Sequence, residues 1–146
     1  RVGAGKQSTF QLTPTDGAGG GISLDGALRF ASAGFPVALG LGATVQNASD
    51  DAQSITWFYA EPEIRVLRSR NLEAALIGRF AMGNAERITV DPSVYGAGVQ
   101  LMYALRPDAA HRGPAVHVRY SFGTIQNTQV DGKTMHSVFA GLAWTF

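Results

Sequence analysis

The stretch Val138-Phe139-Ala140-Gly141-Leu142-Ala143-Trp144-Thr145-Phe146 decides how this sequence is expected to fold. Its residues alternate between two faces, one of which carries Val138, Ala140, Leu142, Trp144 and Phe146. Successive side chains of a β-strand point to opposite faces of the sheet, so a period of two is the pattern of a strand. The stretch therefore predicts a β-strand with one strongly apolar face.

The same alternation recurs in six internal segments, which cover residues 22–30, 37–46, 58–66, 72–82, 95–105 and 115–122. In these segments one parity contains no charged residue. The other parity holds Asp25, Arg29, Glu61, Glu63, Arg65, Glu73, Arg79 and Arg119. A weaker alternating segment at 7–13 brings the expected number of strands to eight, and an even number places both ends of a barrel chain on the same side.

The composition agrees with strands that separate lipid from a polar interior. The chain has 146 residues, the size of one domain over 1–146. It is 45% hydrophobic and 16% charged, and the charged fraction lies below the roughly 25% of an average soluble domain. Its mean hydropathy is nevertheless only +0.02. No run of about 18 apolar residues exists, which excludes a transmembrane helix, whereas near-neutral hydropathy suits a membrane β-barrel.

Charge and cysteine content exclude several classes of partner and site. The formal net charge of +1 gives no reason to expect a nucleic-acid partner. The chain contains no cysteine, which removes disulfides, thiolate metal sites and cysteine nucleophiles. His111, His117 and His136 lack metal-ligand spacing, so neither a metal nor a cofactor is expected. Because no apolar signal segment opens the sequence, a processed chain is expected.

The segment lengths match the thickness of an outer membrane. A nine-residue strand is about 30 Å long, and a tilt of about 40° lets it span roughly 23 Å. Aromatic residues near the segment ends resemble interfacial girdles: Phe30, Phe58, Phe80, Tyr95, Tyr120, Phe122, Trp144 and Phe146. The sequence therefore predicts an all-β fold, a closed antiparallel eight-stranded transmembrane β-barrel in up-and-down meander order. Its apolar parity would face lipid.

The alternative is a soluble ligand-binding barrel of the lipocalin kind, in which the apolar parity faces inward and the charged parity faces water. Its outer face would be poor in charge, since one segment would expose only Ala38, Gly40, Gly42 and Thr44 to water. Small residues suit instead the narrow lumen of an eight-stranded barrel, which side chains fill. The lipid-facing arrangement is therefore favoured.

Size, strand number and the ending Gly141, Trp144 and Phe146 resemble the small outer-membrane proteins typified by the OmpX and OmpA transmembrane domains. In that family the last strand is read by the barrel-insertion machinery, so the three residues would form a carboxy-terminal insertion signal. The resemblance implies a place in the bacterial outer membrane, in contact with its lipid and lipopolysaccharide. Phe139 departs from the pattern, which usually has a polar residue there.

The charged parity would fill the lumen with four acidic and four basic side chains. An eight-stranded barrel is too narrow for a water channel, and an unpaired buried charge costs several kcal/mol. A structural salt-bridge network without an open pore is therefore expected. A narrow ion or proton path through Glu61 and Glu63 is the alternative.

A lipid-modifying hydrolase is a further alternative. An eight-stranded lipid A deacylase family uses a His-x-Ser pair in its seventh strand with a Glu from the next strand, and Ser121 is similar in position to that serine. Arg119, however, stands where the base should be, and no Glu follows. His117 would lie roughly 13 Å from Ser121 along a strand. No catalytic residue is therefore expected.

The expected function is that of a non-enzymatic outer-membrane module. It would act alone through its loops, as a structural or adhesion protein, or as a subunit of a larger assembly with other outer-membrane proteins. The short linking segments favour the subunit.

Overall fold

The computed structural model describes residues 2–11, 21–31, 35–48, 54–85, 93–105, 113–126 and 134–145. Within them, side chains are described for 27–31, 35–45, 56–84, 93–105, 113–126 and 134–144. The described segments are almost entirely β-strand. They are β1 Val2–Gln11, β2 Gly21–Ala31, β3 Val37–Ala48, β4 Ser54–Arg68, β5 Leu72–Ala85, β6 Ser93–Ala104, β7 Gly113–Gln126 and β8 Thr134–Thr145.

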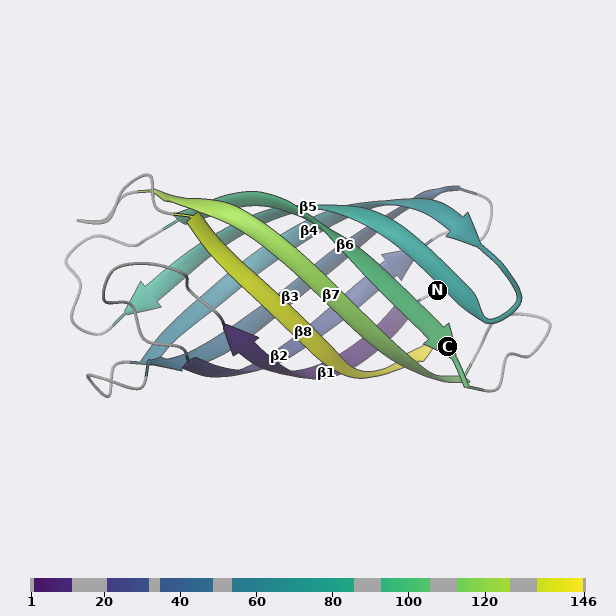
Figure 1. The fold of residues 1–146 in the computed structure, drawn as a ribbon, viewed down its shortest axis with the longest axis horizontal. Helices are drawn as coiled ribbons and strands as arrows, with labels where there is room; N and C mark the ends of the chain where they lie inside the picture. The colour runs from purple at the N-terminus through teal and green to yellow at the C-terminus, as the bar shows by residue number, and fades with distance from the viewer. Residues whose placement is uncertain are drawn as a thin grey trace.

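Strands β2 to β8 form an antiparallel meander that curls around a long axis, with the strands inclined to that axis (Figure 1). Each strand pairs with the next one along the chain. The prediction of an all-β antiparallel meander is thus confirmed. We call the end where β4 meets β5 the turn end, and the opposite end the loop end.

The backbone of β1 runs between β2 and β8, with Phe10 opposite both Ile22 and Val138. The sequence predicted this strand over 7–13, but β1 begins at Val2 and ends at Gln11. Its first half contains Gly3, Ala4 and Gly5. Such small side chains carry no alternation, so only the pairing with neighbouring strands reveals that this part is extended.

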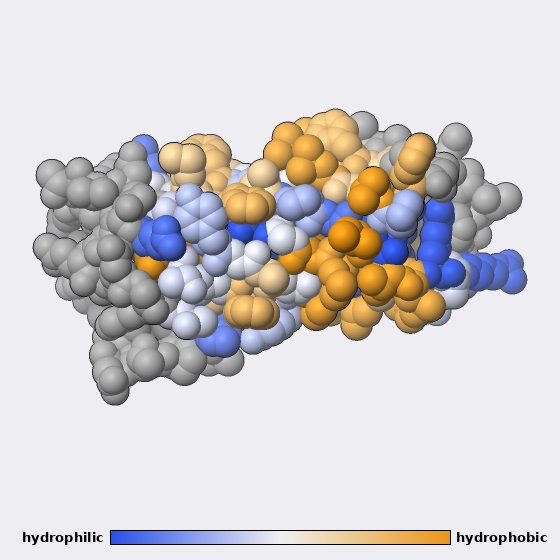
Figure 2. Space-filling model, turned by 90° about the horizontal axis from the view of Figure 1, so that it is seen from above, coloured by the Kyte–Doolittle hydropathy of each residue, from blue (hydrophilic) through white to orange (hydrophobic). Residues whose placement is uncertain are grey.

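The two faces of the curled sheet are opposite in chemistry. On β7, Val116, Val118, Tyr120 and Phe122 are exposed on the outer face. Ala115, His117, Arg119 and Ser121 alternate with them and are buried on the inner face. Figure 2 shows apolar side chains gathered over part of the outer surface. A water-soluble domain buries large apolar residues and exposes charges, so this sheet is inverted.

The aromatic residues expected near the strand ends lie on this outer face. Those described are Phe30, Phe58, Phe80, Tyr95, Tyr120, Phe122 and Trp144, and all of them are exposed. Phe80 and Tyr95 meet edge to face, with ring centroids 5.7 Å apart. Phe146 lies outside the described residues.

Pro62 lies within β4 without shifting its register. The pairing with β5 keeps one register from Ala60↔Phe80 to Glu63↔Ile77. The proline ring lies over Gly78, where an added Cβ would be 3.4 Å from Pro62 Cγ. That distance is an ordinary van der Waals contact, so a small side chain would also fit beneath the ring.

The register shift of β4 occurs further on, between Arg65 and Leu67. One extra residue lets Val66 and Leu67 both be exposed, at 58% and 51%. From there the parity is reversed, as expected for a β-bulge. The predicted strand ended at 66, whereas β4 continues to Arg68, which lies opposite the inner-face residue Glu73.

Apolar side chains fill the loop end of the interior. The cluster consists of Trp57, Tyr59, Ala81, Val94 and Met135, with Ala27 and Ile125 packed against it. These residues come from both halves of the meander, so the cluster ties distant strands together. On β2, β4, β5 and β7 the members of the cluster share the parity of the charged residues.

Candidate functional site

The interior beyond the apolar cluster holds two groups of charged side chains, and β4 contributes residues to both. Glu61 belongs to the first group, and Glu63 and Arg65 belong to the second, which lies nearer the turn end. We call them the Arg119 cluster (Glu61, Arg79, Arg119) and the Arg29 cluster (Arg29, Glu63, Arg65, Glu73).

The Arg119 cluster joins β4, β5 and β7. Arg119 donates through Nη1 to Oε2 of Glu61, and Arg79 Nη1 lies 3.6 Å from Glu61 Oε1. Arg79 also donates through Nη1 to the hydroxyl of Ser121 at 3.3 Å. The three charged side chains are no more than 3% exposed, so the cluster lies deep in the interior.

Two aromatic rings face these guanidinium groups. The Cζ atom of Arg119 lies 4.2 Å from the ring centroid of Phe139, and that of Arg79 lies 4.7 Å from the ring centroid of Tyr59. Arginine over the face of an aromatic ring is stabilised by the ring quadrupole, more strongly where water is excluded. Phe139, which departs from the insertion-signal pattern, therefore has a packing role beside Arg119.

The Arg29 cluster joins β2, β4 and β5. Arg29 Nε lies 2.7 Å from Glu63 Oε2, and Arg29 Nη2 lies 2.6 Å from Glu73 Oε1. Arg65 Nη1 approaches Glu73 Oε2 at 3.8 Å. Taking a charge out of water is costly unless an opposite charge and hydrogen bonds compensate it. Each carboxylate of the cluster therefore lies against at least one arginine.

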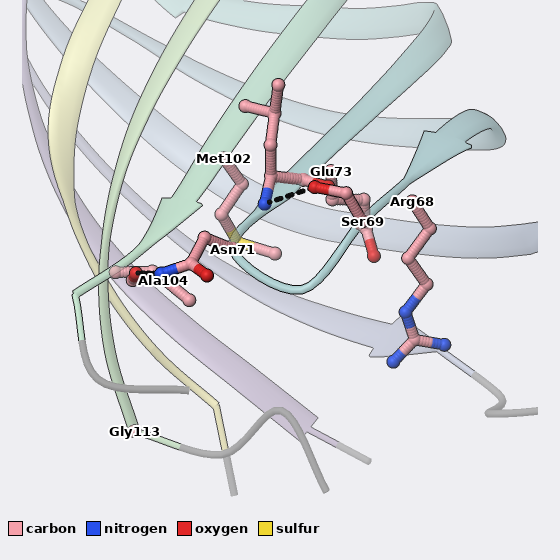
Figure 3. A pocket seen from close by; sticks show the side chains of 9 residues that line it. Arg68, Ser69, Asn71, Glu73, Met102, Ala104 and Gly113 are labelled. Carbon is pink, nitrogen blue, oxygen red and sulfur yellow. Dashed lines mark hydrogen bonds between the residues drawn. The ribbon is translucent and has the colours of Figure 1, made fainter. Parts of the chain in front are cut away.

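A small pocket lies beside the Arg29 cluster at the turn end (Figure 3). Its volume is about 30 Å³, which leaves room for about two water molecules. It is lined by Arg68, Ser69, Asn71, Leu72, Glu73, Met102, Ala104, Gly113 and Ala115. The pocket is thus too small for an organic ligand.

The β4–β5 turn beside this pocket is held in place by hydrogen bonds. The Ser69 amide donates to the Leu72 carbonyl at 2.8 Å, and the Leu72 amide donates to the Ser69 hydroxyl at 3.2 Å. The side-chain amide of Asn71 donates to the Ala104 carbonyl at 3.3 Å, and the Ala104 amide donates back to the Asn71 carbonyl. These bonds fix the turn against the end of β6.

Seven of the eight charged residues singled out from the sequence lie in these two clusters. For Asp25, only the backbone is described, opposite Thr44 on β3. Of the expected insertion signal, Gly141 lies opposite His117, and Trp144 is exposed on the outer face opposite Pro114. Phe146 falls outside the described residues.

Sequence reasoning did not identify Trp57, Tyr59 and Phe139 as interior residues. The signal was available, because Trp57 and Tyr59 share the parity of the charged residues on β4, and Phe139 alternates with the apolar parity of β8.

Two of the residues considered for hydrolysis, Ser121 and His136, lie on opposite faces of the sheet. Ser121 is buried and accepts its hydrogen bond from Arg79. His136 lies toward the outer face, where its Nδ1 is 2.8 Å from the Tyr120 hydroxyl and its ring stacks on that of Tyr120. Within the described segments, no group of three or more His, Cys, Asp or Glu could hold a metal ion.

Among the described residues, no helix is long and apolar enough to cross a membrane. No protein-family model, curated protein or solved structure matches this chain.

Proposed function

We propose that the sheet closes through β1 into an eight-stranded β-barrel that spans the bacterial outer membrane and acts there as a non-enzymatic anchoring module without an open pore. The observation that carries this proposal is the inversion of the two faces. Large apolar side chains are exposed on the outer face, whereas Glu61, Arg79 and Arg119 are at most 3% exposed. A lipid solvent outside and a packed polar lumen inside account for both facts.

The height of the apolar belt supports a membrane environment. On β4 the exposed apolar residues run from Phe58 to Leu67, which is about 30 Å along the strand and about 23 Å after a tilt of roughly 40°. Toward the loop end the exposed residues become polar, as at Asn84, Thr124 and Thr134. A belt of this height matches the roughly 25 Å apolar band of outer-membrane barrels.

Closure is supported by the backbone of β1, which has a register with β2 on one side and β8 on the other. A closed sheet has no edge, and in lipid an open edge would leave backbone groups without hydrogen-bond partners. The outer-membrane location rests on the resemblance of Gly141, Trp144 and Phe146 to the insertion signal of the OmpX and OmpA class.

The contents of the lumen support a barrel without conductance. From loop end to turn end, β4 contributes Trp57 and Tyr59 to the apolar cluster, Glu61 to the Arg119 cluster, and Glu63 and Arg65 to the Arg29 cluster. An eight-stranded lumen is just wide enough for such side chains. In planar bilayers we expect no conductance, and steady single-channel currents would instead favour the narrow ion path.

The test of the proposed function is heat-modifiability together with membrane fractionation. We expect the protein in the outer-membrane fraction, with an unboiled sample that migrates faster than a boiled one because the closed barrel resists the detergent. A protein that stays in the soluble fraction and shows no shift would contradict the proposal.

Within this class, we favour a subunit of a larger outer-membrane assembly over a protein that acts alone. The segments that link strands at the loop end have five to nine residues, and short connections offer little surface for adhesion. Affinity purification from detergent-solubilised membranes tests this preference. A stoichiometric partner is expected, and recovery of the protein alone would favour independent action.

A further inference from the structure

The near-zero net charge of this chain conceals a separation of charge between its two ends. The segments that link strands at the loop end, 12–20, 49–53, 86–92 and 127–133, contain six acidic residues and two basic ones. At the turn end, Arg68 closes β4, and the segments 69–71 and 105–112 contain three arginines and one aspartate. The turn end is therefore basic and the loop end acidic.

Arg68 and Arg70 are the arginines of the turn end that the structure describes, and both are exposed. Arg68 is paired in the β4–β5 register with Glu73, which carries a carboxylate. That carboxylate, however, is already engaged by Arg29 and Arg65. None of the ion pairs found among the described residues involves Arg68 or Arg70. Among the described residues, neither arginine is therefore paired with a carboxylate.

The two arginines lie just beyond the apolar belt. Val66 and Leu67, both exposed, are its last members on β4, and Arg68 and Arg70 follow them by one to four residues, within about 13 Å along an extended chain. In Figure 2 hydrophilic side chains protrude at the right-hand end, next to the apolar region. If the belt lies in hydrocarbon, arginines at this height reach the depth of lipid headgroups.

The bulge of β4 and the fixed turn place both arginines at the rim of the turn end. The reversal of parity keeps Arg68 away from the outer apolar face, opposite Glu73 at the rim of the interior. In Figure 3 its side chain extends away from Asn71 and Met102. Arg70 lies in the turn that the bonds of Ser69 and Asn71 hold against β6. Because the turn is already held in place, it loses less conformational entropy when a ligand binds.

We propose that Arg68 and Arg70 form a binding site for the phosphate groups of anionic lipids in the membrane leaflet at the turn end. The inference rests on the proposed membrane-spanning function. Guanidinium groups match phosphate with charge and paired hydrogen bonds. The adjoining Val66 and Leu67 would contact the acyl chains of the same lipid. An acidic protein would also meet the charge, but it would not use this adjacent apolar surface at headgroup depth, so the structure favours lipid.

The experiment is native mass spectrometry of the full chain in detergent, titrated with phosphatidylglycerol or with phosphatidylcholine of the same acyl chains. We expect the wild type to prefer phosphatidylglycerol. An arginine near an anionic surface contributes about fivefold to affinity, so Arg68→Gln with Arg70→Gln should weaken phosphatidylglycerol binding by about 25-fold. Binding of phosphatidylcholine should change little.

The matched control is Arg87→Gln with Lys133→Gln, which removes the same charge from segments that link strands at the loop end. This variant should keep the lipid preference. Equal binding of the two lipids by the wild type, or an unchanged preference in the Arg68 and Arg70 variant, would overturn the proposal. Arginine-dependent capture of an acidic protein without any lipid preference would overturn it in favour of a protein partner.

Heat-modifiability of each protein before the titration separates this inference from the proposed function. If the wild type does not form a heat-modifiable barrel, the membrane-spanning function itself fails. If the barrel forms and the lipid preference is absent, only the lipid site fails. Both arginines are exposed, so their substitution should leave the shift in mobility unchanged.

Discussion

The two faces of β4 have the same backbone and meet different surroundings. Its inner face carries Tyr59, Glu61 and Glu63, which are buried, and its outer face carries Phe58 and Ile64, which are more than half exposed. Inside, each side chain is held by specific partners on other strands. Outside, the side chains have few partners within the protein. The polar inner face therefore makes most of the specific contacts within the protein. The apolar outer face mainly contacts the surroundings of the protein.

The inner face should be the more sensitive to loss of a single charge. Glu61→Gln removes the carboxylate that both Arg79 and Arg119 contact, and breaking a buried ion pair costs about 3–5 kcal/mol. We expect the midpoint of urea unfolding, followed by tryptophan fluorescence, to fall accordingly. Glu73→Gln is the comparison, because its side chain is 12% exposed and water can partly replace its bonds. Equal losses in the two variants would mean that depth in the interior does not matter.

The outer face should reject charge only when it faces lipid. Ile64→Lys places an ammonium group on the outer apolar belt, where 55% of Ile64 is exposed, and lysine on the lipid face of a barrel costs about 2–4 kcal/mol near the midplane. Unfolding in phospholipid vesicles should report this loss of stability. Ile64→Ala is the control for shape. A lysine variant as stable as the alanine variant would indicate that this face does not lie in hydrocarbon.

The contact between β6 and β7 tests whether the inner face tolerates added volume. A Cβ on Gly98 would meet the Tyr120 carbonyl oxygen and Ser121, with no space between the strands. Gly98→Ala should therefore cost about 1–3 kcal/mol, the usual range for overpacking. Ala97→Gly, at the exposed neighbouring position, removes volume on the other face and should be milder. The fraction of heat-modifiable protein after refolding measures both, and the reverse ranking would contradict the prediction.

The smallest effect is expected from a polar contact on the outer face. Tyr120→Phe removes the hydroxyl that bonds His136 Nδ1 at 2.8 Å, and a neutral hydrogen bond contributes about 0.5–1.5 kcal/mol. The ring stacking should persist. A shift in the urea midpoint as large as that of Glu61→Gln would show that the outer face also depends on specific internal contacts.

The alternation of residues was sufficient to predict most strands and the chemistry of their faces. On β7, for example, the apolar residues Val116 to Phe122 are all exposed, and Arg119 is buried between them. This succeeded because parity is a local property: each residue of a strand points opposite to its neighbours, whatever the strand pairs with.

The pairing of charges could not be predicted, because it depends on register and on strand tilt. Arg29 meets both Glu63 and Glu73, although 34 and 44 residues separate them in sequence. The bulge at Val66 was not predicted either, because Val66 and Leu67 are ordinary strand residues. Proline is recognisable by type, whereas a bulge of ordinary residues is visible only in the register with the partner strand.

The bulge of β4 has a consequence for how such a sequence can change during evolution. In a sheet between two solvents, inserting or deleting one residue exchanges the surroundings of every residue up to the next turn. If β4 continued past Val66 in regular alternation, without the bulge, Leu67 would point toward the interior and Arg68 toward the outer surface. A substitution alters one position at a time. A short insertion near the end of a strand can therefore change more quickly which side chains point outward at that end of the sheet.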